Sequence, residues 1–402
     1  MAFQLIILYC FISLSLILSF FYLMVLLDRT ALKFKPLKKF PEVTFVIPAF
    51  NAENCIEKTI RAIFDADYPK NKIKVFVVND GSTDNTLNIL NSLKKEYSLQ
   101  IFNKTNEGRK AYALNYGIKQ VKTPYTVVLD ADTIISRGLL KKSIQRFENP
   151  IIMAVTSKII PDSRRTFFER MQFVEYAFTS YARDILHAAN SVQTTPAYAA
   201  FRTEFFRKYG LFDADNITED VEMGLRIQKY HYDIGYVFDS FAETAVPTRL
   251  KDILRQRVRW GYGVFYNLFK YRRLFHPEYG DFGIFFLPSM FLGILVILGA
   301  FILAGYNIVS SSINLIHHLS LGWLPVFETN FFDVIVSVSQ LKVMLSIFIF
   351  LFALLLFFIV KQNTKEITLW DYVQYMLIYN WFLAYFYIVV IIKFISGSKL
   401  KW

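Results

Sequence analysis

A run of 24 residues without a charged side chain lies at the start of the chain and limits what the chain can fold into. The run, QLIILYCFISLSLILSFFYLMVLL, covers residues 4–27. As a helix rising about 1.5 Å per residue it would reach about 36 Å, which is enough to cross a bilayer. A secretory signal peptide would carry basic residues before the run and small residues at a cleavage site, and neither is present. The sequence therefore predicts an N-terminal transmembrane helix.

Basic residues follow this run rather than precede it: Arg29, Lys33, Lys35, Lys38 and Lys39. By the positive-inside rule, the N-terminus would lie outside and the next domain in the cytosol. Three more apolar stretches, at about 284–308, 343–360 and 373–392, indicate a multi-pass protein of the plasma membrane. The tail basic residues Lys393, Lys399 and Lys401 would then lie outside, against the rule, unless one stretch is re-entrant or a further crossing is hidden.

Composition excludes several classes of protein. The chain is 54% hydrophobic and only 19% charged, which is typical of a membrane protein. Cys10 and Cys55 would lie in different compartments and make no disulfide framework, and the five histidines show no metal spacing. The net charge of +12 is not accompanied by an RNA-binding motif of aromatic and basic residues, so we expect no nucleic acid partner. Attraction of the basic residues to anionic lipid headgroups explains the excess charge.

Three apolar runs of β-forming residues punctuate the more polar middle of the chain. They are VTFVIPAFN (43–51), the first part of IKVFVVNDGSTDNT (73–86) and YTVVLDADT (125–133). They alternate with helical patterns of about a dozen residues, which indicates βαβ units, an α/β fold and a mostly parallel sheet.

Carboxylates stand where two of these strands end. Asp80 follows the second strand, and Asp130 and Asp132 follow the third. Ligands bind beyond the carboxyl ends of such strands, and carboxylate oxygens suit Mg²⁺ or Mn²⁺. The alternative is that Asp130 and Asp132 are only turn or helix-capping residues.

Two downstream segments complete the set of polar motifs. Glu219 and Asp220 open an amphipathic helix in 215–230, where capping alone would explain them. In the basic stretch 249–273, helical spacing places Gln256, Arg259 and Trp260 on one face. That stretch could be a lipid-facing anchor, or Trp260 could stack on a sugar while Arg259 pairs with a pyrophosphate.

An aromatic-rich helical stretch, 170–185, has two possible roles. We expect it to pack on the sheet or the bilayer. The alternative is a wall on which a sugar stacks.

In this order and spacing, PAFNAE, NDGSTDNT, DAD, TED and QRVRW resemble the motifs of the membrane-integrated family 2 glycosyltransferases, the group of cellulose, hyaluronan and poly-N-acetylglucosamine synthases. The resemblance covers roughly residues 40–265. It implies a GT-A-type, Rossmann-like cytosolic domain joined to an α-helical transmembrane region. The domains would be an N-terminal helix and basic linker (1–39), the transferase domain (40–248), interfacial helices with the Q-x-x-R-W motif (249–280) and about three spans (281–402).

The resemblance also implies roles for individual residues. Asp220 would be the general base, beside Glu219, with Gln256, Arg259 and Trp260 closing over the pyrophosphate and the acceptor. Asp132 would hold the metal together with Asp130. The donor would be bound by these residues: Pro48, Phe50, Asn51, Glu53, Asp80, Lys110 and Asp130.

The chemistry required agrees with this assignment. A leaving diphosphate needs neutralising charge, and an attacking hydroxyl needs one base. A single base without a carboxylate nucleophile implies inversion. We therefore expect an inverting enzyme that uses a nucleotide-sugar donor, most readily a UDP-sugar, and extends a β-linked polysaccharide processively. About four spans make only a small channel for the polymer, so a second protomer or a partner subunit would be needed to form it.

Two alternatives are open. A non-processive enzyme could add one sugar to a lipid such as a sphingolipid or a polyprenyl phosphate, so that the acceptor is a glycan or a lipid. A transport or scaffold protein could carry an inactive transferase-like domain, but the presence of every motif carboxylate argues against it.

Overall fold

The computed structural model describes residues 37, 39–321, 354, 356–358, 361, 364 and 366–396. Three predicted segments lie outside these residues wholly or nearly so. They are the span at 4–27, almost all of the span at about 343–360, and the end of the basic tail.

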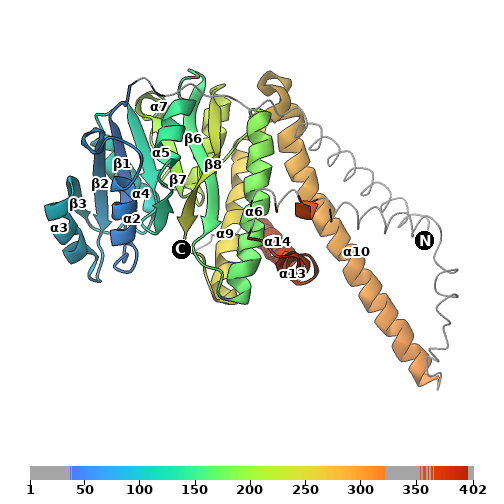
Figure 1. Ribbon diagram of the computed structural model, residues 1–402. Helices are drawn as coiled ribbons and strands as arrows, with labels where there is room; N and C mark the ends of the chain where they lie inside the picture. The colour runs from blue at the N-terminus through green and yellow to red at the C-terminus, as the bar shows by residue number, and fades with distance from the viewer. Residues whose placement is uncertain are drawn as a thin grey trace.

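An eight-stranded sheet in the order β3-β2-β1-β4-β7-β6-β8-β5 forms the centre of the domain (Figure 1). The strands are β1 (Val43–Ala49), β2 (Ile73–Asp80), β3 (Leu99–Lys104), β4 (Tyr125–Leu129), β5 (Thr133–Ile135), β6 (Ile152–Pro161), β7 (Tyr198–Arg202) and β8 (Asp233–Thr244).

The predicted parallel arrangement holds for only part of this sheet. Strands β3, β2, β1 and β4 are parallel neighbours. In the other half, β7 runs antiparallel to both β4 and β6, β8 is parallel to β6, and β5 is antiparallel to β8. The sheet is therefore mixed, but six of its eight strands run in one direction and only β7 and β5 run in the other, so the prediction of a mostly parallel sheet is confirmed. Its basis, the alternation of strands with helices, identifies strand residues but does not give the direction of a strand such as β7.

Helices cover both faces of the sheet. One face packs against α2 (Ile56–Phe64), α3 (Thr86–Glu96) and α5 (Leu139–Arg146). The other packs against α4 (Lys110–Lys119), α7 (Thr203–Tyr209) and α8 (Glu219–Lys229). Short helical turns complete this part: η1 (Lys70–Lys72), η2 (Arg272–Leu274), η3 (Pro277–Tyr279) and η4 (Phe282–Phe286).

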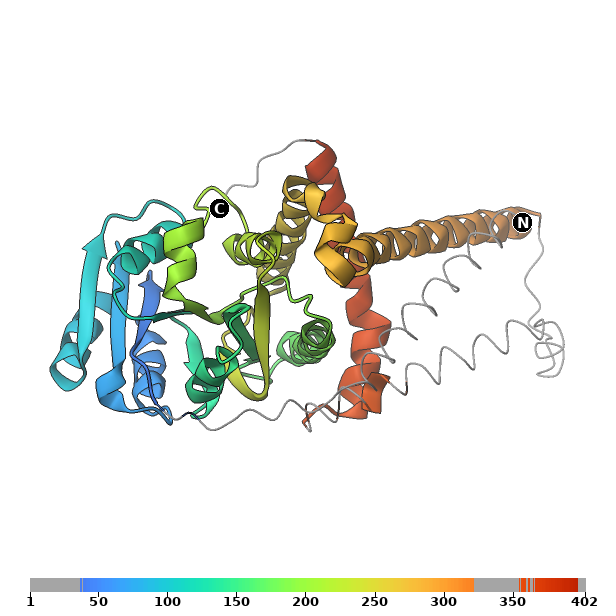
Figure 2. The same ribbon diagram turned by 90° about the horizontal axis from the view of Figure 1, so that it is seen from above.

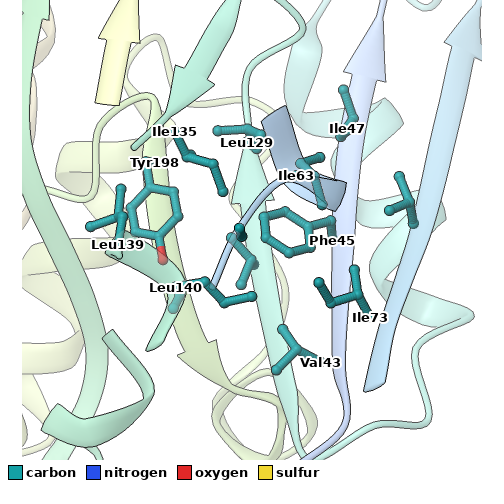
Figure 3. Packing of buried hydrophobic residues seen from close by; sticks show 14 of the residues in the cluster. Val43, Phe45, Ile47, Ile63, Ile73, Leu129, Ile135, Leu139, Leu140 and Tyr198 are labelled. Carbon is teal, nitrogen blue, oxygen red and sulfur yellow. The ribbon is translucent and has the colours of Figure 1, made fainter. Parts of the chain in front are cut away.

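Strand β1 shows why its sequence is almost continuously apolar. Alternate side chains of a strand point to opposite faces, and here both faces are covered by helices. Val43, Phe45 and Ile47 enter the core that contains Ile63 of α2 (Figure 3). Val46 enters the core on the opposite face. The first three strand predictions at 43, 73 and 125 are thereby confirmed.

A second group of helices lies beside β6 and β8. It comprises α6 (Phe167–Ala188), α9 (Leu250–Lys270), α13 (Leu369–Gln374), η5 (Tyr375–Tyr379) and α14 (Asn380–Ile395). Helix α6 packs against β6, α13 and η5, while α9 packs against α14. Helix α10 (Leu287–Ser320) projects away from the sheet (Figures 1 and 2). The helices predicted in 170–185 and 249–273 are confirmed as α6 and α9.

None of the helices in the described ranges combines the length and the apolar character needed to cross a bilayer. The stretches predicted as spans at about 284–308 and 373–392 are helical, and their membrane insertion stays a prediction.

Asp233, at the start of β8, gives the fold a testable pH dependence. Burial raises the pKa of its carboxyl to about 6. Since the unfolded value is about 3.9, ionising this carboxyl destabilises the folded state, and the cost grows between about pH 4 and pH 6. We expect Asp233→Asn to unfold at higher urea than the wild type above about pH 6, with the difference vanishing below about pH 4. A gain in stability that is the same at all pH values would contradict this.

Candidate active site

A cavity of about 860 Å³ lies where β4 ends and α6, α8 and α9 approach one another. Its wall includes eight of the residues predicted as site residues from the sequence: Lys110, Asp130, Asp132, Glu219, Asp220, Gln256, Arg259 and Trp260. Three motifs spread over residues 130–260 of the sequence therefore meet at one cavity.

The two carboxylates of the D-A-D motif lie in the turn between β4 and β5. The amide of Asp130 donates to the carbonyl of Ala197 at 3.0 Å, and the amide of Thr133 donates to the carbonyl of Asp130 at 3.1 Å. The hydroxyls of Thr133 and Thr244 lie 3.3 and 3.4 Å from Oδ1 of Asp132. Burial, and then the charge of Asp130, raise the pKa of the Asp132 carboxyl to about 6. The turn thus holds the two carboxylates close enough for the charge of Asp130 to disfavour ionisation of Asp132.

Lys110, the first residue of α4, lies between the acidic residues. Its ammonium forms an ion pair with Oδ1 of Asp130 and lies 3.7 Å from Oε1 of Glu219. Burial alone would lower the pKa of Lys110, but the two carboxylates outweigh this effect and raise it. Lys110 therefore joins the turn after β4 to the start of α8.

Glu219 and Asp220 begin α8, as the sequence predicts. Glu219 is buried, and burial raises the pKa of its carboxyl although Lys110 opposes the shift. The main-chain carbonyl of Asp220 accepts hydrogen bonds from the amide and the hydroxyl of Thr195, at 3.3 and 3.1 Å. This contact joins α8 to the segment 194–197, which also lines the cavity.

A buried polar network that the sequence did not reveal attaches α8 to α9. The side-chain amides of Asn216 and Asn267 exchange hydrogen bonds of 2.8 and 3.1 Å, and Asn267 also donates to the hydroxyl of Thr218 at 3.0 Å. Thr218 packs so closely on Gly263 that a Cβ atom there would lie 2.3 Å from it. The spacing of Gly263 and Asn267, four residues apart on one face of α9, was the signal available in the sequence.

The Q-x-x-R-W motif lies on α9 with all three of its named side chains at the cavity. Arg257, which stands between Gln256 and Arg259 in the sequence, is buried and pairs with Glu175 of α6. Neither Arg257 nor Glu175 was singled out from the sequence.

Helix α6 contributes to the wall as well as to packing. Its cavity-lining residues are Glu175, Tyr176, Thr179 and Arg183. Phe178 instead stacks on Tyr375, with ring centroids 5.5 Å apart. The expected packing on the sheet is confirmed by the contacts of α6 with β6 and β8, while Tyr176 lies in the cavity wall, where the alternative, a stacking wall, requires it.

The predicted donor loops lie at the ends of β1 and β2 and hold each other in place. The amide of Asn51 donates to the hydroxyl of Ser82 at 3.1 Å, and Oδ1 of Asn51 accepts from the amide of Thr83 at 2.8 Å. Glu53 similarly accepts from the amide of Asn85 at 2.9 Å. The described residues that line the cavity do not include the loop Pro48–Glu53, in which Phe50 is largely exposed. The donor-binding role of this loop stays a prediction.

Asp80 does not form the expected group of three carboxylates with Asp130 and Asp132. It is buried and accepts a hydrogen bond of 2.8 Å from Lys104. Among the residues that the structure describes, no three His, Cys, Asp or Glu side chains are arranged to hold a metal ion. The predicted role of Asp80 in donor binding does not depend on a metal and stays a prediction.

Asp130 and Asp132 nevertheless fit a divalent cation. Their oxygens are hard ligands, and a bound cation would oppose the burial and the Asp130 charge that raise the pKa of Asp132. Mg²⁺ commonly uses only one or two carboxylates and completes its coordination with substrate phosphates and water.

The close contact of Gly263 with Thr218 predicts a cost for adding one methyl group. Gly263→Ala should lower the free energy of unfolding by about 1–3 kcal/mol, because the new atom overlaps a buried side chain. The same substitution in a Thr218→Ala background should cost less, because the two atoms that overlap most, Cγ2 and Oγ1 of Thr218, are absent. Urea denaturation of the four proteins measures this coupling. Additive effects would show that the two residues are not in contact.

Comparison with known proteins supports the same interpretation of these motifs. Glycosyltransferase like family 2 matches residues 41–263. The poly-β-1,6-N-acetyl-D-glucosamine synthase of Staphylococcus epidermidis is 28% identical over 226 residues, which are 55% of this chain and 54% of that protein. The synthase of the same name from Staphylococcus aureus (strain MSSA476) is 30% identical over 227 residues, again 55% and 54% of the two chains. The chain thus spans about half the length of these curated relatives.

A solved structure resembles the fold over nearly the whole chain. It is a mannosyltransferase from Pyrobaculum calidifontis in complex with GDP-Man and Mn²⁺, with 17% identity, a TM-score of 0.64 and coverage of 99% of both chains. The mixed α/β sheet is therefore of the glycosyltransferase GT-A type. Since the family match extends over more than half of the chain and contains the carboxylates and the Q-x-x-R-W motif, the chain belongs to glycosyltransferase like family 2.

Proposed function

We propose that this enzyme transfers a sugar from a nucleotide-sugar donor, most readily a UDP-sugar, to a hydroxyl group, with inversion at the anomeric carbon. The observation that carries the proposal is the single cavity that brings together the D-A-D carboxylates, the start of α8 and the Q-x-x-R-W face of α9. These are the groups that a single displacement needs, namely a cationic surface for the leaving diphosphate and a base for the nucleophile.

The residues of the chain divide this work. Asp220 would take the proton of the attacking hydroxyl, and Glu219 would keep Lys110 close to that position. Lys110 and Arg259 would face the diphosphate, as their charge and their place in the cavity wall allow. Gln256 and Trp260 would bind the acceptor end, where an indole can cover one face of a sugar ring.

Donor recognition and the metal would use the neighbouring turns. Pro48, Phe50, Asn51 and Glu53, with Asp80, would bind the base and the ribose. Asp130 and Asp132 would hold Mg²⁺ or Mn²⁺, which supplies charge neutralisation for the diphosphate when it is bound.

We propose a processive β-polysaccharide synthase as the leading activity. The similarity to two proteins named as poly-β-1,6-N-acetyl-D-glucosamine synthases supports it. In this proposal the protein is a multi-pass plasma-membrane enzyme with a cytosolic catalytic domain, and a second protomer or another subunit helps to form the exit path.

A specific observation favours the alternative, a transferase that modifies a single lipid acceptor. The cavity continues from the charged end toward the C-terminal helices, where Met290, Phe386 and Val390 line it. An apolar wall of this kind could hold the lipid part of an acceptor.

Both proposals are tested by one assay. The purified protein in detergent, with Mn²⁺ or Mg²⁺, is given radiolabelled UDP-glucose, UDP-N-acetylglucosamine, UDP-glucuronate or GDP-mannose, and the products are separated by size. We expect one donor to be used, with polymer as the product. A single extractable glycolipid would favour the alternative.

Variants connect the activity to the cavity. Asp220→Asn should lower kcat by about 10²–10⁴-fold because the base is lost. Asp132→Ala and chelation by EDTA should each abolish transfer, and Mn²⁺ should restore only the chelated wild type. Asp239→Asn is the control, since that exposed carboxylate pairs with Lys142 away from the cavity. Full activity of Asp220→Asn would remove this residue as the base.

A further inference from the structure

A buried ion pair joins α6 to α9 in the wall of the cavity. Nε and Nη2 of Arg257 donate to the two carboxylate oxygens of Glu175, at 2.9 and 2.6 Å. The side chains are only 5% and 13% exposed, so water screens the pair little. The two parallel hydrogen bonds fix the plane of the guanidinium group as well as its position.

The same guanidinium contacts two residues of the Q-x-x-R-W motif. Nη1 of Arg257 donates to Oε1 of Gln256. The guanidinium carbon Cζ of Arg257 lies 4.3 Å from the ring centroid of Trp260. Both Gln256 and Trp260 line the cavity. Arg257 therefore restricts the amide and the indole that the proposed function assigns to the acceptor end.

The other side of the pair is held by the C-terminal part of the chain. The hydroxyl of Tyr379 donates to Oε2 of Glu175 at 3.0 Å, and the Tyr379 side chain is fully buried. Tyr379 ends η5, far beyond residues 41–263 that match the family. A segment outside the family match thus contacts Glu175, which itself lines the cavity.

Stability alone is a poor explanation for this arrangement. The cost of removing two charges from water often equals or exceeds the gain from their attraction, and apolar residues of similar size commonly do as well. What apolar residues could not supply is a directional contact to Gln256 and a cation against Trp260.

We propose that Arg257 is a positioning residue, held by Glu175 and Tyr379, which fixes Gln256 and Trp260 for the transfer reaction. This inference rests on the proposed function. It also means that η5 controls the geometry of the cavity, because Tyr379 orients the carboxylate to which Arg257 binds.

Tyr379→Phe tests the proposal with a matched control. Tyr198→Phe removes an equally buried hydroxyl, which donates to Ser143 at 2.9 Å on the far side of β7, within the core around Leu139 (Figure 3). The two variants should lose similar thermal stability. Only Tyr379→Phe should lower kcat, by about tenfold with the donor KM nearly unchanged, because misplacing a catalytic group slows the reaction without weakening donor binding.

A spectroscopic measurement gives a second result that does not need activity. The emission of Trp260 is obtained by subtracting the emission spectrum of the Trp260→Phe counterpart from that of each protein. We expect its emission to shift in Tyr379→Phe and in Arg257→Lys, which keeps the charge but lacks the forked geometry. It should not shift in Tyr198→Phe.

The outcomes separate the two proposals. If Tyr379→Phe behaves as Tyr198→Phe does in both kcat and Trp260 emission, the role is only structural and the inference is overturned. If the wild type uses no nucleotide sugar, the proposed function fails, and the Trp260 emission still decides whether Glu175 and Tyr379 position Arg257 against the indole.

Discussion

The ion pairs of Lys110 are the interaction on which the geometry of the cavity depends. One ammonium group lies between the carboxylate that ends β4 and the carboxylate that begins α8. Without it, four acidic side chains, Asp130, Asp132, Glu219 and Asp220, would share one cavity with much less opposing charge. In the proposed function the diphosphate of the donor would lie next to this cluster, and Lys110 and a cation held by Asp130 and Asp132 would offset its charge.

The helices around the cavity are held by polar contacts that are individually specific. Asn216, Asn267 and Thr218 attach the start of α8 to α9, and Glu175 with Arg257 attaches α9 to α6. Apolar packing would tolerate small sliding movements of these helices, whereas paired amides and a forked guanidinium accept only one arrangement. The motif residues at the cavity are thus oriented by residues that the motif assignments do not include.

The C-terminal helices give the cavity an apolar end. Its charged end consists of residues within the family match, while Met290, Phe386 and Val390 line the other end. A polar reaction centre next to an apolar wall is consistent with an acceptor that is either a lipid or a growing chain leaving toward the membrane. In the proposed function, different parts of the chain would therefore determine the donor chemistry and the acceptor class.

The sequence by itself determined the first strands and helices α6, α8 and α9, because the spacing of apolar and polar residues sets local structure and one helix face. Seven of the predicted residues at the cavity stood out by their position in these elements, whereas Lys110 was implied by the family resemblance alone. Only the tertiary structure decided the antiparallel direction of β7, the pairing of Asp80 with Lys104, and the contacts of Arg257 with Glu175 and Tyr379. These depend on which segments meet across 24 to more than 200 residues. Periodicity is a property of neighbouring residues, and it contains no information about such distant partners.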